Sequence, residues 1–280
     1  MTTEESHAFC VVTPNFNMGQ YLARTIESVI QNLRPGDQYF IIDGGSTDNS
    51  VDVIKKYEKH LTGWISEPDK GYADAIAKGF SRSDSDYMCW INSGDLLLEG
   101  ALDEARIQLS SLSTDMIFGD DFYIDETDKV ISHSCGRVDS LKNMMLFGGW
   151  TPLQDACFWK RDLYNAIGGF DVKQKYAADY DLFLRMSMVG RCEYIPAVFS
   201  AFRKHVGQKS IQGQLNYKSE RTACRANVLY KSKYTPLSKW LLITYYWVLV
   251  RVRSRILRSF YRSKRNAGES VLNLLCCKYK

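Results

Sequence analysis

The chain has few residues of the kinds that mark common cofactor and metal sites. Among 280 residues there are 6 Pro and 4 His, and the 8 Cys form no Cys-x-x-Cys pair. Scattered cysteines predict reduced, cytosolic thiols and argue against a zinc or disulfide framework. Neither a Gly-x-Gly-x-x-Gly fingerprint nor a Gly-x-x-x-x-Gly-Lys-Ser/Thr loop is present, so neither a dehydrogenase nor a P-loop enzyme is expected.

The chain also has no segment that would be expected to cross a membrane. Its longest apolar stretch, residues 240–250, has eleven residues, whereas a spanning helix needs about 20. The first residues are acidic and polar, which predicts no secretory signal. With 45% apolar and 24% charged residues, the composition is that of a globular protein large enough for a sizeable core.

Positive charge is concentrated in the last part of the chain. The net charge is +4, but residues 239–280 hold ten Lys/Arg and one Glu and so carry +9, which leaves −5 for residues 1–238. After the stretch at 240–250, four arginines follow at helical spacing, namely Arg251, Arg255, Arg258 and Arg262. This pattern is typical of an amphipathic helix lying on anionic lipid. A helix packed on the rest of the chain, with its arginines solvated, is the alternative.

Short apolar runs alternate with helical segments through the first half of the chain. Buried strands are predicted at 8–13, 39–43, 64–66 and 87–91, and helices at 21–33, 50–60 and 72–80. Strands and helices that alternate at this spacing form βαβ units with right-handed crossovers. The predicted fold class is therefore α/β, with a mostly parallel, Rossmann-like sheet and flanking helices.

Three of the predicted strands end in acidic turns. Asp43 closes the second strand, Glu67 and Asp69 follow the third, and Asp95 follows the fourth. Because ligands of open α/β sheets bind at the carboxyl edge, these groups are expected to share one cleft. Clustered carboxylates repel one another unless a metal ion or a base lies between them.

Nine short motifs follow one another in a recognisable order. They lie at 13–17 (TPNFN), 42–48 (IDGGSTD), 66–71 (SEPDKG), 90–95 (WINSGD), 154–159 (QDACFW), 168–171 (GGFD), 178–185 (ADYDLFLR), 202–205 (FRKH) and 208–210 (QKS). This order resembles that of the inverting family-2 nucleotide-sugar glycosyltransferases of GT-A fold, particularly those that build bacterial surface polysaccharides. The resemblance covers roughly residues 8 to 230.

The resemblance implies a set of donor-binding residues in the first half. The exit of the first strand and the aspartate of the second would hold the nucleobase, and the loop after the third strand would reach the ribose and diphosphate. Carried over by motif, these residues are Thr13, Pro14, Asn15, Asp43, Asp69 and Lys70. A carboxylate can accept the imide N–H of a uracil-like base. The alternative for each is an ordinary turn residue.

The resemblance also implies a divalent metal, Mg²⁺ or Mn²⁺, bridging the donor diphosphate. The family motif is Asp-x-Asp, but here the aligned residues are Asn92-Ser93-Gly94-Asp95 and only Asp95 is acidic. Asn92 is expected to hydrogen-bond the ribose, and the departure puts metal affinity in doubt more than the fold. His205 matches a histidine that completes metal or phosphate binding in relatives, although a lone histidine is also often structural.

An inverting transfer needs a general base beside the acceptor hydroxyl. By resemblance this base is Asp179, the second residue of Ala178-Asp179, where relatives usually have Glu-Asp. A helix N-cap is the alternative role for Asp179. Gln154, Asp155 and Trp159 would line the acceptor side, with Trp159 stacking on a sugar or lying in the core. The roles of Asp120 and Asp121 stay open.

The motifs together predict one catalytic domain and a basic extension. Residues 1–232 would form the GT-A domain, with a donor half at 8–120 and an acceptor half at 121–232, and residues 233–280 a helical, membrane-associated extension. The predicted activity is inverting transfer of a sugar from a UDP- or dTDP-type donor to a glycan or lipid-linked acceptor in polysaccharide biosynthesis. The predicted location is cytoplasmic, peripheral on the inner face of the cell membrane, with no nucleic-acid partner.

Two alternative functions differ from this one in the residues that they would need. A non-catalytic glycan-binding or assembly module with the same fold is suggested by Asn92 and Gly94, whereas retention of Asp95 and Asp179 argues against it. A nucleotidyltransferase that forms sugar nucleotides would need a Gly-rich loop with Arg or Lys after the first strand, and residues 14–19 do not provide one.

Overall fold

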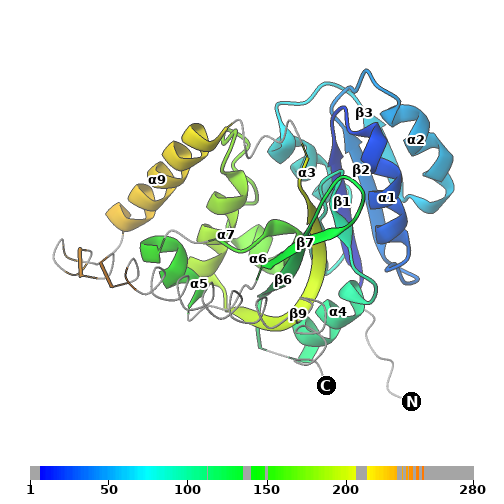
Figure 1. Cartoon of the computed structure of the whole chain (residues 1–280). Helices are drawn as coiled ribbons and strands as arrows, with labels where there is room; N and C mark the ends of the chain where they lie inside the picture. The colour runs from blue at the N-terminus through cyan, green and yellow to red at the C-terminus, as the bar shows by residue number, and fades with distance from the viewer. Residues whose placement is uncertain are drawn as a thin grey trace, which may run out of the picture.

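One mixed sheet forms the centre of the computed structural model, and helices cover both of its faces (Figure 1). The structure describes residues 7–111, 113–134, 140–148, 151–205 and 213–231, together with isolated positions between 235 and 248. Within these residues the sheet has nine strands in the order β3-β2-β1-β4-β8-β6-β9-β5, with β7 beside β6. The α/β fold class predicted from the sequence is confirmed.

The first half of the chain forms the parallel part of the sheet. Its elements are β1 (Phe9–Asn15), α1 (Gly19–Ile30), β2 (Gln38–Asp43), α2 (Ser50–Tyr57), η1 (Glu58–His60), β3 (Gly63–Ser66), α3 (Tyr72–Phe80) and β4 (Tyr87–Trp90). Strand β1 pairs in parallel with β2 and β4, and β2 with β3. The predicted βαβ order is present, and it brings the ends of β1 to β4 to one edge.

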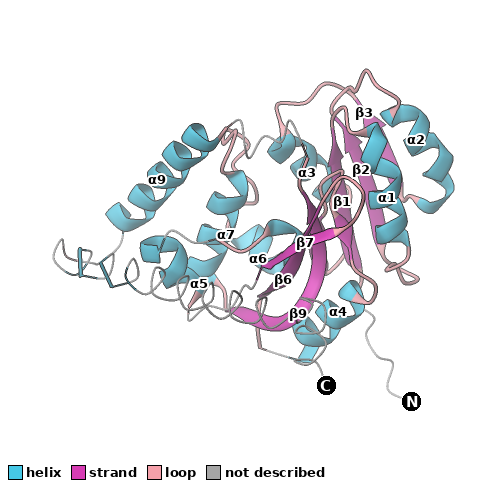
Figure 2. Ribbon diagram, in the orientation of Figure 1, coloured by secondary structure: helices cyan, strands magenta, loops and turns pink. Residues whose placement is uncertain are grey.

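The second half departs from the mostly parallel sheet predicted from the sequence. Its elements are β5 (Leu96–Leu97), α4 (Ala101–Ser111), β6 (Met116–Ile124), β7 (Val130–Ser134), α5 (Leu141–Asn143), η2 (Met144–Gly148), η3 (Gln154–Ala156), β8 (Cys157–Lys160), α6 (Arg161–Ala166), α7 (Ala178–Val189), β9 (Cys192–Arg203) and α9 (Gln214–Lys231). Here β6 and β9 are parallel, but β8 runs antiparallel to β4 and β6, β7 to β6, and β5 to β9. Figure 2 shows the sheet curling through this half.

Alternating side chains of the central strands divide the core into two apolar layers. In β1, Phe9 and Val11 point to the layer under α1, α2 and α4, whereas Cys10 and Val12 point to the layer under α3 and α7. This is the period-two pattern of strands that are buried on both faces. Because both faces are filled, ligands can reach the sheet only at its edges and ends.

The predicted basic extension lies almost entirely outside the described residues. Helix α9 ends at Lys231, and the predicted membrane helix begins beyond it, so its conformation and the boundary at 232 stay predictions. Among the residues that the structure describes, none of the helices is both long and apolar enough to span a bilayer.

Candidate active site

A cluster of hydrogen bonds joins the ends of β1, β2 and β3. The buried Asp43 carboxylate accepts hydrogen bonds from Asn15 Nδ2 at 2.6 Å, Ser66 Oγ at 2.6 Å, and both the Oγ and the backbone N–H of Ser46, at 2.5 and 2.9 Å. Burial alone would raise the pKa of Asp43, but these hydrogen bonds outweigh burial and lower it. Asp43 is therefore ionised at neutral pH.

The same bonds use all four lone-pair positions of the Asp43 carboxylate. A base that donated its imide N–H to Asp43 would have to displace the hydroxyl of Ser46 or Ser66. Asn15 offers another acceptor, because its Oδ1 is buried and has no hydrogen-bond donor among the described residues. Asn15 and Asp43 are thus brought together as the motifs predicted, and Asn15 has the available acceptor.

Thr13 and Pro14 contribute to this edge in different ways. The Thr13 hydroxyl is fully buried and shares a 2.9 Å hydrogen bond with the hydroxyl of Tyr39. Its side chain therefore points into the apolar layer, and a role of Thr13 in base binding stays a prediction. Pro14 presents its carbonyl oxygen to the Ser93 hydroxyl at 3.1 Å and so ties the end of β1 to the turn after β4.

The loop after β3 folds back over the exit of β2. Asp69 accepts the backbone N–H of Gly71 at 2.7 Å, and its other oxygen lies so close to Gly44 that a Cβ there would meet it at 2.6 Å. Lys70 is exposed beside it. Phe16 also approaches Gly44 and leaves 58% of its surface exposed. An exposed ring at a sheet exit can stack on a nucleobase, a role that the sequence did not suggest.

The turn after β4 has a backbone that only glycine adopts readily at position 94. Gly94 has φ +108°, its N–H donates to Thr25 Oγ1 at 2.9 Å, and its carbonyl accepts from Arg203 Nε at 2.8 Å. An aspartate at this φ would be strained. Glycine therefore suits the backbone of this turn at position 94. Asn92 Nδ2 lies 3.4 Å from Asp95 Oδ2.

Asp95 lies at the end of this turn, and one of its two carboxylate oxygens makes a long hydrogen-bond contact. Its Oδ1 accepts the backbone N–H of Arg203 at 2.9 Å, whereas Oδ2 has, among the described residues, only the long contact from Asn92. Burial, and then the charge of Asp155, raise the pKa of Asp95 well above its ordinary value. A nearby cation would reverse that effect.

His205 reaches the same corner from the end of β9. Its ring lies 5.6 Å from the ring of Tyr21, which also stacks under the Arg203 guanidinium at 4.9 Å. No group of three metal-binding side chains converges among the described residues. One carboxylate and one imidazole fit a Mg²⁺ or Mn²⁺ ion that takes its remaining ligands from a diphosphate and water, because such ions use few protein ligands.

Two more carboxylates lie behind Asp95. Asp121 on β6 and Asp155 on η3 are each 1% exposed, so both carboxyl groups are removed from solvent. Burial raises the pKa of Asp155 to about 6, and burial with the charge of Asp155 raises that of Asp121 to about 9. Asp120 faces the opposite way and accepts a 2.8 Å hydrogen bond from Tyr194, which is a structural role.

Asp179 lies at the start of α7, where residues of two other helices hold the backbone in place. Glu220 of α9 accepts the backbone N–H groups of Tyr176 and Ala177 at 2.8 and 2.9 Å, and the Tyr72 hydroxyl of α3 accepts that of Ala178 at 2.9 Å. These contacts cap the helix, so Asp179 is not its N-cap. The sequence indicated neither Tyr72 nor Glu220 as part of the site.

The Asp179 carboxylate is available for proton transfer. Its Oδ1 has no hydrogen-bond donor among the described residues. Burial raises its pKa from 3.8 to about 6, opposed by nearby backbone N–H groups and the charge of Arg221. An acid of this pKa can act as a base near neutral pH.

The predicted acceptor residues separate into two groups. Gln154 and Asp155 lie together on η3, and both amide atoms of Gln154 are buried without a partner among the described residues. Trp159 is fully buried and packs edge-on against Trp90 and Phe80, at 5.5 and 5.9 Å between ring centroids. Its ring is therefore part of the core, as the alternative reading had it, and does not offer a face to a sugar.

Comparison with known proteins agrees with the motifs. The family model described as glycosyl transferase family 2 matches residues 10–119. An uncharacterized glycosyltransferase of Mycobacterium tuberculosis is 30% identical over 188 residues, which are 65% of this chain and 69% of the relative. The chain belongs to glycosyl transferase family 2. Glycosyltransferase activity, as predicted, follows from this membership.

Solved structures of other proteins share the fold. Residues 1–349 of Staphylococcus aureus TarS in complex with UDP-GlcNAc superpose with a TM-score of 0.68 at 14% identity, covering 85% of this chain and 71% of that one; against a longer TarS structure the coverage is 42% of TarS. A mannosyltransferase from Pyrobaculum calidifontis, in complex with GDP-Man and Mn²⁺, superposes with a TM-score of 0.61 at 14% identity over 98% of this chain and 79% of that one. These likenesses establish the GT-A fold.

Proposed function

We propose that this glycosyltransferase moves a sugar, with inversion, from a UDP- or dTDP-type donor to a hydroxyl of a glycan or lipid-linked acceptor in polysaccharide biosynthesis. The observation that carries the proposal is the Asp179 carboxylate, which is rigidly mounted, lacks a hydrogen-bond donor on one oxygen among the described residues, and has a pKa of about 6. Inversion in one step needs a base of this kind beside the acceptor.

The donor would lie along the exits of β1, β2 and β4. Asn15 Oδ1, held beside the Asp43 carboxylate, would accept a hydrogen bond from the base, and the exposed Phe16 ring would stack on it. Asp69 and Lys70 on the loop after β3 would reach the ribose and diphosphate. A UDP-sugar is supported by the TarS complex with UDP-GlcNAc, although the mannosyltransferase complex holds GDP-Man.

The leaving diphosphate would be neutralised at the Asp95 corner. Asp95 and His205 would hold a divalent cation, which supplies charge stabilisation to the leaving group. The Mn²⁺ complex of the mannosyltransferase supports this assignment. Asn92 is placed to hydrogen-bond the ribose or Asp95.

In the transfer itself, Asp179 would accept the proton of the acceptor hydroxyl as its oxygen attacks the anomeric carbon and the nucleoside diphosphate departs. Gln154 and Asp155 lie on the acceptor half, where their polar atoms can orient a sugar through its hydroxyls. Tyr72 and Glu220 would keep the base in place through the first turn of α7.

The test is a donor screen. Purified protein is incubated with common UDP-, dTDP- and GDP-sugars, with and without Mn²⁺, and release of the nucleoside diphosphate is measured. We expect turnover of a UDP- or dTDP-sugar that depends on Mn²⁺ and is lost in Asp179→Asn. Binding of a nucleotide sugar with no turnover of any donor, alone or with a mixed glycan acceptor pool, would instead favour the non-catalytic module.

A further inference from the structure

The buried guanidinium of Arg203 holds the turn that contains Asp95 in place. At the end of β9, Arg203 is 1% exposed; its Nε donates to the Gly94 carbonyl and its Nη1 to the Asp125 carbonyl, both at 2.8 Å. The backbone N–H of the same residue donates to Asp95 Oδ1. One arginine thus holds both the carbonyl that precedes Asp95 and the Asp95 carboxylate.

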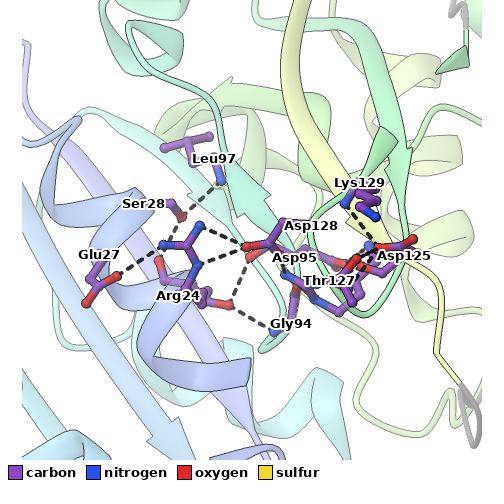
Figure 3. A network of polar contacts seen from close by, with 12 residues as sticks. Arg24, Glu27, Ser28, Gly94, Asp95, Leu97, Asp125, Thr127, Asp128 and Lys129 are labelled. Atoms are coloured by element: carbon purple, nitrogen blue, oxygen red, sulfur yellow. Dashed lines mark hydrogen bonds and ion pairs between the residues drawn. The ribbon is translucent and has the colours of Figure 1, made fainter. Parts of the chain in front are cut away.

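The charge of Arg203 is balanced by a hairpin that is distant in sequence. Asp128, in the turn between β6 and β7, pairs with Arg203 Nη2 through one carboxylate oxygen. Its other oxygen accepts from Arg24 of α1, from Nε at 3.0 Å and from Nη2 at 2.8 Å. Figure 3 shows Arg24 reaching across to Asp128 beside Gly94 and Asp95. The carboxylate of Asp128 therefore links α1 and β9 on either side of the Asp95 turn.

The hairpin turn is shaped to present this carboxylate. Asp128 has φ +66°, a left-handed conformation that Asp and Asn tolerate better than other side chains. Asp125 closes the turn by accepting the backbone N–H groups of Thr127 and Lys129 at 2.8 and 3.0 Å. The turn is therefore ordered by its own contacts, and the Asp128 carboxylate remains for the two arginines.

A buried guanidinium that loses the carboxylate paired with it is unfavourable, because the carbonyl oxygens that it contacts do not balance its charge. Loss of the Asp128 charge would be relieved by movement of Arg203 toward water, which would release the Gly94 carbonyl and the N–H that holds Asp95. We propose that Asp128 is a positioning residue of the donor site, which acts through Arg203 to fix the Asp95 carboxylate and is itself held by Arg24. This role rests on the proposed function of Asp95 in diphosphate binding.

The experiment compares variants of the full chain by calorimetric titration with UDP in the presence of Mn²⁺. Asp128→Asn keeps the left-handed conformation and removes the charge, whereas Asp128→Gly keeps the backbone and removes the whole side chain. For both we expect UDP affinity to fall about tenfold, the lower end of the cost of losing a hydrogen bond to a charged group. Asp128→Glu moves the charge by one methylene and is expected to recover part of the loss.

Two further variants separate positioning from general stability and from the function of Asp95. Asp103→Asn removes an exposed ion pair elsewhere on the surface, between Arg34 in the loop after α1 and Asp103 of α4 at 2.6 Å, and should leave UDP affinity unchanged. Asp95→Asn removes the carboxylate that the network positions, and should lose at least as much UDP affinity as Asp128→Asn.

In steady-state hydrolysis of the donor, Asp128→Asn should raise KM for the donor while kcat at saturation changes less. A kcat that falls as far as donor affinity would indicate a general structural defect and overturn the proposal. So would wild-type UDP affinity in Asp128→Asn when Asp95→Asn has lost it. If Asp95→Asn binds UDP as the wild type does, the donor role of Asp95 fails, and this proposal fails with it.

Discussion

The pKa of about 6 for Asp179 predicts a characteristic pH dependence of turnover. If this carboxylate is the base, the rate follows its ionised fraction, which is about nine-tenths at pH 7 and about one-tenth at pH 5. Turnover should therefore fall about tenfold over these two pH units. An aspartate with the ordinary pKa of 3.8 would still be more than nine-tenths ionised at pH 5.

The assay is release of nucleoside diphosphate from the preferred donor, with donor and Mn²⁺ saturating and ionic strength constant from pH 4.5 to 8. Asp179→Asn keeps the size of the side chain and should reduce turnover by about 10²–10⁴-fold at pH 7, the usual contribution of a positioned base. Its donor affinity should equal that of the wild type, because Asp179 lies on the acceptor half.

Asp155 is the alternative explanation for a fall in turnover between pH 7 and pH 5, because its pKa is also about 6. Asp155→Asn should reduce acceptor affinity but keep this fall in turnover if Asp179 is the base. A pH-independent rate in that variant, or normal turnover by Asp179→Asn, would refute the assignment of Asp179.

Stability gives a second readout of the same pKa. A carboxyl group whose pKa is raised in the folded state makes folding less favourable once it ionises, so the fold gains stability as pH falls from about 6 toward 3.8. This rise in pKa corresponds to at most about 3 kcal/mol. Asp179→Asn should therefore be more stable than the wild type at pH 7 in urea unfolding, with a difference that disappears near pH 4.

Three further predictions concern other parts of the chain. Asp121→Asn should stabilise the protein at pH 7 by up to about 4 kcal/mol in urea unfolding, and not at pH 4, because its pKa of about 9 in the fold means that folding must protonate a group with an ordinary pKa of 3.8. Gly94→Asp, which restores an acid to the metal motif, should weaken rather than strengthen Mn²⁺-dependent UDP binding, because φ there is +108°. Replacing Arg251, Arg255, Arg258 and Arg262 by Glu in the full chain should abolish salt-sensitive binding to anionic liposomes in a flotation assay while leaving UDP affinity intact; equal flotation of both forms would contradict the membrane role.

Local patterns in the sequence were sufficient for the parallel half of the fold. Strand runs such as 39–42 are apolar throughout because both faces of the sheet are covered, and this signal is local. The antiparallel insertion of β8 between β4 and β6 depends on pairing between residues about 70 positions apart, such as Met88 and Trp159, and no local pattern encodes it. The two-residue strand β5 is too short to have a periodicity.

The same distinction applies to the candidate site. Asp43, Asp95 and Asp179 belong to short motifs and could be selected from the sequence, whereas the burial of the Thr13 and Trp159 side chains is decided by packing, which the motifs do not show. Arg203 belonged to a recognised motif, but its role depends on Asp128, which is 75 residues away. Charge balance between distant residues is visible only once the chain is folded.

The backbone conformation at Gly94 changes how the departure from the Asp-x-Asp motif is interpreted. In the sequence, Asn92 and Gly94 suggested that the chain had kept the fold and lost the chemistry. In the structure, the residue at 94 must adopt φ +108°, donate to Thr25 and accept from Arg203, and glycine does this without strain. The glycine thus serves the turn that holds Asp95 against the N–H of Arg203. Arg203, whose charge Asp128 balances, holds the same turn through the Gly94 carbonyl. The glycine at 94 is therefore accounted for by the backbone of this turn, and its presence is not by itself a sign that the chemistry has been lost.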